Sequence, residues 1–223
     1  AEVIAIHMTW AQMLSDGPTA FFTLLAAWWY IRTRQGAYRA RDVILLGVLL
    51  GFIGMLRFTG LLIAFVIGGL FLLEKQWTKL VLLVAVSLLA FAPQMLYNLH
   101  FFGSPLTTGY TALDRLPPDG LFSLTYLLDA LAKIWERLGL LTVILAILGM
   151  GGMGAVLWRL RWVPGLLVGG WLLSYLALYS LYYYSWTGAL MRFLIPALPA
   201  AVVLIAALIA WGFQAIPTRT SAR

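Results

Sequence analysis

The sequence has no cysteine, only two histidines and few acidic residues. The absence of cysteine excludes disulfides, thiolate nucleophiles and cysteine-ligated metal sites. Charged residues make up 10% of the chain, against roughly a quarter in an ordinary soluble domain. Hydrophobic residues, in contrast, make up 63%. A soluble fold could not bury so much apolar surface, so the composition predicts an integral membrane protein.

Long apolar runs alternate with short polar turns. This pattern predicts an all-α, polytopic membrane protein with about seven transmembrane helices and one interfacial amphipathic helix. We expect one transmembrane domain over residues 1–223, with an interfacial lead-in at 1–15, an outer loop at 103–120 and an amphipathic interfacial helix at 121–138. Ser15-Asp16-Gly17-Pro18 predicts the start of the first membrane helix. The membrane helices are expected near residues 15–32, 43–56, 61–73, 79–102, 139–158, 163–185 and 193–216.

The net charge of +7 follows the expected topology. If the loop at 32–41 is cytoplasmic, alternation of the helices places the basic residues at 75–79, 159–161 and 219–223 on the same side. Ten of the fifteen Lys and Arg residues then lie on that side. The positive charge therefore indicates which loops face the cytoplasm, and we expect no nucleic-acid partner.

Two of the apolar runs are too short to cross a bilayer. The run from Val43 to Leu56 has 14 residues, or roughly 21 Å of helix, against a hydrocarbon core of about 30 Å. The turn after it should therefore stop below the outer surface and place Arg57 at membrane depth. A cation there is costly unless it faces a polar cavity or a partner anion.

Small residues recur at helical spacing in two of the runs. The pairs are Gly47 with Gly51 and Gly165 with Gly169. A Gly at both ends of a four-residue step lets two helices approach closely. We expect these glycines to pack helices together, with no role in binding phosphate.

Three groups of residues carry a resemblance to a known family. They are Ser15-Asp16 with Gly47-xxx-Gly51-xx-Gly54-xx-Arg57-x-Thr59-Gly60, then Pro93-xxx-Tyr97-Asn98-xxx-Phe102-Gly103-Ser104-Pro105-xxxx-Tyr110, and then Arg192-Phe193-Leu194-Ile195-Pro196-Ala197-Leu198-Pro199. In order and spacing, from about Met13 to the last helix, they resemble the polytopic GT-C glycosyltransferases, in particular the protein mannosyltransferase and aminoarabinose transferase branch.

The resemblance implies a function at the outer face of a membrane. Such enzymes transfer a sugar from a polyprenyl-phosphate donor, and some need a divalent metal ion. The expected partners are therefore membrane lipids and a polyprenyl-phosphate sugar, with a divalent metal as a candidate cofactor. We expect a multi-pass protein of a bacterial or archaeal plasma membrane. The family's acidic motif in the first outer loop has no counterpart here, so we expect the chain to be such an enzyme or the C-terminal part of one.

Two other classes of function remain open. One is a non-catalytic subunit of a larger membrane complex, built on a truncated transferase fold and bound to other membrane subunits. The missing acidic loop motivates this alternative. The other is a transporter, which predicts ionisable groups near mid-membrane and two related halves. The sequence shows no related halves, and apart from Arg57 the charges cluster at the ends of the runs.

Asp16 is the candidate catalytic residue. The resemblance links a carboxylate at this point to the active site, where it could act as a general base or hold a metal. Its position also fits a simple helix N-cap. Arg57 and Arg192 are candidate clamps for a lipid phosphate, because a guanidinium can grip two oxygens at once. The alternative for both is a cation that snorkels to the interface.

Four further residues are candidates for substrate binding. Tyr97, Asn98 and His100 fall where the fourth helix reaches the outer loop, and Tyr110 lies in that loop. A hydrogen-bonding role at the interface is the alternative for His100. A metal site would need further ligands, and His7, Asp16 and His100 could form one only if the fold brought them together. We therefore assign no metal ligand.

Overall fold

A computed structural model of the chain describes residues 2–107, 122–140, 151, 154, 162–182 and 193–215. Within these ranges the regular structure is helical, apart from one isolated bridge between Phe122 and Tyr182. The predicted all-α class is confirmed. The helices are α1 (Glu2–Gln35), α2 (Ala40–Leu56), η1 (Phe58–Gly60), α3 (Leu61–Leu73), α4 (Trp77–Phe102), α5 (Leu124–Leu138), α7 (Trp162–Ser180), η3 (Ile195–Ala197) and α9 (Leu198–Ala215).

Polar and glycine residues end the helices where the sequence predicts. Arg57 is extended, with φ −160° and ψ 129°, and separates α2 from the short helix η1. Gly103 ends α4 in the left-handed conformation, at φ 72°, and its N–H donates to the Leu99 carbonyl at 3.1 Å. The Ser123 side chain caps α5 by accepting from the N–H of Thr125 at 3.2 Å. The predicted amphipathic helix at 121–138 is thus confirmed as a helix from Leu124 onward.

The first helix begins earlier than predicted. α1 runs from Glu2 to Gln35 with Pro18 inside it, so the predicted helix start at Ser15 is wrong. Proline fits the first turn of a helix, and inside a helix it removes one backbone hydrogen bond and its ring crowds the carbonyl four residues back, so the sequence favoured a helix start here. Residues 2–14 continue the same helix, and Asp16 lies within α1 instead of at its N-cap.

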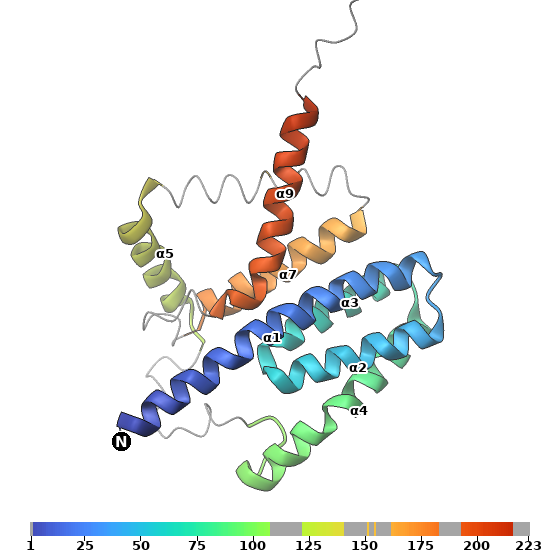
Figure 1. Cartoon of the computed structure of the whole chain (residues 1–223), viewed down its shortest axis with the longest axis horizontal. Coiled ribbons are helices and arrows are strands. Elements are labelled where there is room, and N and C mark those ends of the chain that lie inside the picture. The colour runs from blue at the N-terminus through green and yellow to red at the C-terminus, as the bar shows by residue number, and fades with distance from the viewer. Residues whose placement is uncertain are drawn as a thin grey trace, which may run out of the picture.

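α2 packs between α1 and α4. Figure 1 shows α1 and α2 side by side, with α4 packed on α2 and with α7 and α9 on the other side of α1. Glycine allows the close approach of α2 and α4: a Cβ at Gly51 would lie 2.5 Å from the Ala90 Cβ, and one at Gly47 would lie 2.9 Å from the Val86 Cβ. The packing role predicted for Gly47 and Gly51 is confirmed.

Two of the described helices are long and apolar enough to cross a membrane. They are Trp77–Phe102, with mean hydropathy 2.1, and Val163–Ser180, with mean hydropathy 1.4. Only 11% of the apolar window in the first is buried, unlike the core helix of a soluble protein. Phe58–Leu73 and Ile195–Ala207 are apolar but shorter. The described ranges therefore do not confirm seven spans, and most of the run expected at 139–158 lies outside them.

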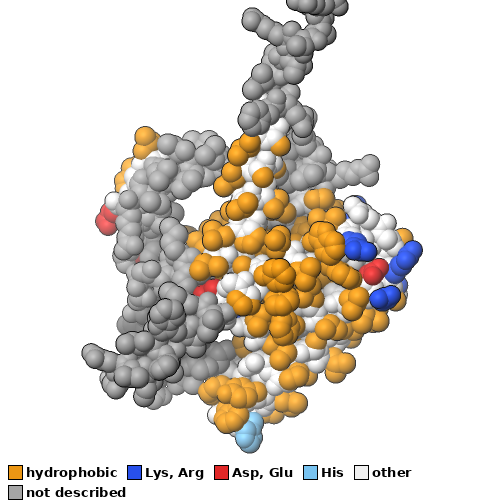
Figure 2. Space-filling model, viewed as in Figure 1, with side chains coloured by type: hydrophobic (Ala, Val, Ile, Leu, Met, Phe, Trp, Pro, Cys, Tyr) orange, Lys and Arg blue, Asp and Glu red, His pale blue; other side chains and the backbone are white. Residues whose placement is uncertain are grey.

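Charge and apolar surface are separated on the visible face. Figure 2 shows hydrophobic side chains over most of the described surface, with Lys and Arg gathered at the end where α1 meets α2. There Arg34 Nε lies 2.6 Å from Glu74 Oε1, which joins the last turn of α1 to the α3–α4 turn. These two basic turns therefore share one end of the bundle, as the charge pattern predicts. Arg57 follows the opposite end of α2.

Candidate functional site

Asp16 and Arg57 form an ion pair inside the bundle. Arg57 Nη1 contacts Asp16 Oδ1, and the side chains are 15% and 1% exposed. Sequence analysis predicts that Arg57 needs a partner anion, and the structure supplies it from a helix about forty residues away. The two candidates for the catalytic and phosphate-binding roles are therefore neighbours.

The local fold of each helix fixes its half of this pair. On α1 a polar stripe recurs at three- and four-residue steps through Asp16, Thr19 and Thr23, all buried. The hydroxyls of Thr19 and Thr23 each donate to the carbonyl four residues back at 2.6 Å, so they need no other partner. On the facing side, the Arg57 N–H donates to the Ile53 carbonyl at 3.0 Å and the Arg57 carbonyl accepts from Gly60 at 2.8 Å. The backbone is thus fixed on both sides of Arg57.

An aromatic ring lies beside the guanidinium, and a second ring supports the first. The Cζ atom of Arg57 lies 5.3 Å from the centre of the Phe193 ring, within the range of a cation–π contact. Phe193 stacks on Tyr179 of α7 with 4.9 Å between ring centres. Tyr175, one turn before Tyr179 on α7, is also buried. Arg57 is therefore held by a carboxylate on one element and an aromatic wall on another.

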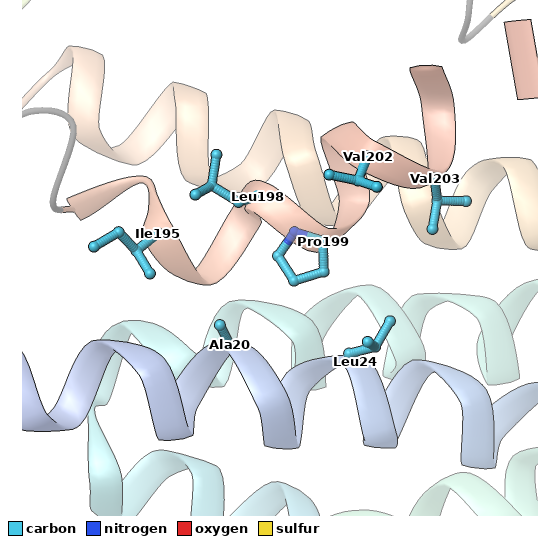
Figure 3. Close-up of a pocket in the computed structure, with 7 residues that line it drawn as sticks. All are labelled: Ala20, Leu24, Ile195, Leu198, Pro199, Val202 and Val203. Carbon is cyan, nitrogen blue, oxygen red and sulfur yellow. The ribbon is translucent and has the colours of Figure 1, made fainter. Parts of the chain in front are cut away.

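An apolar groove of about 380 Å³ lies between α1 and the segment formed by η3 and α9 (Figure 3). Ala20 and Ile195 lie at one end of it in Figure 3. Asp16 is one helical turn before Ala20, and Phe193 is two residues before Ile195. This end of the groove is therefore the one nearer along the chain to Asp16 and Phe193. The groove is lined by Ala20, Leu24, Ile195, Leu198, Pro199, Val202 and Val203.

Three other predicted residues lie at the end of α4. Asn98 is buried; it accepts from Gln94 Nε2 at 2.9 Å and donates to the Pro105 carbonyl at 3.2 Å. These bonds tie the helix end to the turn that follows. Tyr97 and His100 are exposed and contact the ring of Phe101. The described contacts of these three residues reach neither Asp16 nor Arg57.

Some predicted residues fall outside the described ranges. Tyr110 and Arg192 are among them, as is most of the outer loop expected at 103–120. Their proposed roles stay predictions. The same holds for a metal site that includes His7, whose side chain is not described. Within the described ranges, no group of three or more His, Cys, Asp or Glu side chains could hold a metal ion.

Sequence analysis missed a polar cluster around Glu74 at the basic end. The carboxylate accepts from Tyr30 Oη at 3.0 Å, from Arg34 Nε at 2.6 Å and from the Tyr38 hydroxyl. Burial alone would raise the pKa of Glu74, but the three hydrogen bonds outweigh it and hold this pKa below its ordinary value. Burial and the bond to Glu74 raise the pKa of Tyr38 to about 12. The signal in the sequence was Glu74 itself, an acidic residue beside Lys75 at the end of the bundle where basic residues gather.

Compared with known family models, curated proteins and solved structures, the chain shows no significant match to any of them.

Proposed function

We propose that the chain is a GT-C-like membrane glycosyltransferase, or the C-terminal part of one, which transfers a sugar from a polyprenyl-phosphate donor at the outer face. The observation that supports this best is the meeting of Asp16 and Arg57 in one buried site. A carboxylate and a guanidinium are the groups needed to activate an acceptor and to bind a phosphate. They come from separate elements, so the fold itself assembles the site.

The proposed reaction assigns one task to each residue. The acceptor hydroxyl attacks the anomeric carbon of the sugar, and the bond from that carbon to the phosphate oxygen breaks. Asp16 takes the acceptor proton, and Arg57 binds the phosphate that leaves with the polyprenyl chain. The phosphate departs with its charge already delocalised, so the protein mainly has to position the reactants. Arg192, Tyr97, Asn98, His100 and Tyr110 stay proposed substrate contacts.

A divalent metal is also implied by the resemblance, but the described residues around Asp16 do not suit one. The carboxylate faces a guanidinium, which would repel a bound cation. A hard cation such as Mg²⁺ or Ca²⁺ also needs several oxygen ligands. We therefore assign no step of the reaction to a metal ion.

The location follows from the same proposal. We place the chain as a multi-pass protein in a bacterial or archaeal plasma membrane, with the Arg32 to Arg41 turn inside and the Asp16–Arg57 pair toward the outside. The gathering of basic residues at one end of the bundle supports this orientation.

A transfer assay tests the function. The full chain in vesicles receives a labelled polyprenyl-phosphate sugar and an extract of membrane acceptors, and label that leaves the lipid is measured. Asp16→Asn should abolish transfer, whereas Asp42→Asn, a matched change in the first turn of α2 at the basic end, should leave it unchanged. Equal transfer by both variants would exclude Asp16 as the base.

The alternative is a non-catalytic subunit of a larger membrane complex. The 1% exposure of Asp16 favours it, since an ion pair so well shielded could serve packing alone. This alternative predicts a stoichiometric membrane partner that copurifies with the chain. It also predicts that the complex keeps its activity with Asp16→Asn. Loss of activity in that variant, with the complex intact, would exclude it.

A further inference from the structure

Arg32 lies over two tryptophan rings in the last turn of α1. Its Cζ atom is 5.5 Å from the centre of the Trp28 ring and 5.8 Å from the centre of the Trp29 ring, both within the range of a cation–π contact. Trp29 Nε1 also donates to the Asp42 carbonyl at 3.1 Å, which ties this ring to the first turn of α2. The two indoles therefore hold an exposed guanidinium at the place where α1 meets α2, the α1–α2 junction.

The positive charge of this junction is not neutralised by the described carboxylates. Arg39, the N-cap of α2, and Arg41, in its first turn, are exposed like Arg32 (Figure 2). Among the described residues, none of these three cations forms an ion pair, although Asp42 follows Arg41 directly in the chain. Glu74, the acid of the neighbouring turn, already accepts three hydrogen bonds from other side chains. The junction therefore attracts an anion from outside the chain.

An apolar stripe on α1 leads to Arg32. Phe21, Leu24 and Trp28 are 61%, 41% and 50% exposed. Their spacing of three and four residues places them on one face of the helix, and Arg32 is the next residue of that face. In a membrane this face meets the lipid chains, and its tryptophan and arginine come where the hydrocarbon gives way to the head groups.

An anionic phospholipid matches both features. Its acyl chain can lie along the stripe while its phosphate reaches the end of α1, where a guanidinium offers paired N–H donors to phosphate oxygens. A zwitterionic lipid also brings a positive group toward these cations, so a head group with a net negative charge is favoured. An acidic peptide or a free phosphate ion would satisfy the cations but leave the apolar stripe without a partner.

We propose that the α1–α2 junction binds an anionic phospholipid, with its phosphate on Arg32 and an acyl chain along the stripe of Phe21, Leu24 and Trp28. Arg39 and Arg41 add to the attraction from the start of α2. The proposal uses the proposed membrane location, which places this lipid in the inner leaflet. It does not depend on sugar transfer, so the lipid should bind even if the transfer assay shows no activity.

Native mass spectrometry of the full chain in a neutral detergent measures this binding. The probes are phosphatidylglycerol and phosphatidylcholine with the same acyl chains, inorganic phosphate, and a short polyglutamate peptide. Phosphatidylglycerol should bind at least about tenfold more tightly than each of the other three. Arg32→Gln should weaken phosphatidylglycerol by about fivefold, which is the contribution of one basic residue near an anionic lipid surface, and leave phosphatidylcholine unchanged.

Lys75→Gln is the matched control. Lys75 is an exposed cation at the same end of the bundle, next to the Glu74 that pairs with Arg34. Arg34 is two residues from Arg32 on α1, so the two side chains point to different faces of the helix. Lys75→Gln removes the same charge as Arg32→Gln, but it should change the affinity by less than about twofold. Trp28→Leu keeps every charge and should weaken phosphatidylglycerol by about threefold, because one ring under the guanidinium is lost.

Three results would overturn the proposal. The first is equal binding of phosphatidylglycerol and phosphatidylcholine, and the second is binding of polyglutamate or inorganic phosphate as tightly as phosphatidylglycerol. The third is an equal loss in Arg32→Gln and Lys75→Gln, because the cations would then attract anions through their summed charge without a site at the junction. If Arg32→Gln does not fold, Arg41→Gln takes its place in the same comparison with Lys75→Gln.

Discussion

Replacing Arg57 should lower the free energy of unfolding more than replacing Asp16. Arg57→Gln leaves the Asp16 carboxylate at 1% exposure without its cation. Breaking a buried pair in this way typically costs about 3–5 kcal/mol of unfolding free energy. We expect a loss in that range, because the buried charge has no route to water.

Asp16→Asn should lower the free energy of unfolding less than Arg57→Gln. The remaining guanidinium is 15% exposed and keeps its contact with the Phe193 ring, which is worth about 0.5–2 kcal/mol. We expect a loss of about 1–3 kcal/mol, near the cost of leaving one buried polar group unsatisfied. The double variant Asp16→Asn with Arg57→Gln should recover part of the larger loss, because it buries no net charge.

Denaturant unfolding of the four proteins in the same detergent measures this cycle. The coupling energy between Asp16 and Arg57 should exceed about 1 kcal/mol, since residues in direct contact are not additive. Losses that add to within about 0.5 kcal/mol would refute the reasoning, and so would a larger loss for Asp16→Asn than for Arg57→Gln.

Three further predictions concern other parts of the bundle. Gly51→Ala should lower the free energy of unfolding by about 1–3 kcal/mol, since the added Cβ would lie 2.5 Å from a neighbouring helix. Gly69→Ala should not destabilise the protein, because an added Cβ there meets nothing within 4 Å. Unfolding in detergent compares the two variants. The pKa of Glu74 is lowered from 4.5, so its stabilising contribution is complete above that value and is lost as the pH falls through the lower pKa of the folded state. Thermal unfolding between about pH 3 and 7 should show a smaller loss of stability at low pH in Glu74→Gln than in the unmodified protein. Asn98→Ala should cost about 1–3 kcal/mol of unfolding free energy through its two lost hydrogen bonds, which denaturant unfolding in detergent measures; an unchanged free energy would show that these bonds do not stabilise the end of α4.

The sequence predicts helix ends well where a residue acts on its own backbone. Gly103 ends α4, and Arg57 interrupts the apolar run, as expected. It fails at Pro18, because a proline in the first turn and a proline inside a helix look alike from the flanking residues. That error carried a second one: as part of a continuous helix, Asp16 cannot be the N-cap that its neighbours suggest.

Tertiary partners were harder to predict. The short runs around Arg57 indicate that a partner anion is needed, but they do not say that the anion is Asp16. The three donors on Glu74 come from α1 and the loop after it, and no local spacing brings them together. Such contacts depend on how the helices are placed, whereas sequence periodicity reports only on each helix alone.

The Glu74 carboxylate gathers three hydrogen bonds at the basic end of the bundle. Its donors lie on α1 and in the loop after it, so the cluster joins them to the turn between α3 and α4. Farther along the bundle, α1 meets α2 through the rings of Phe22 and Phe52 and meets the turn after α2 through the Asp16–Arg57 pair. If that pair opens, we expect any tilt of α1 against α3 to be smallest at Glu74 and to grow along α1 toward Asp16.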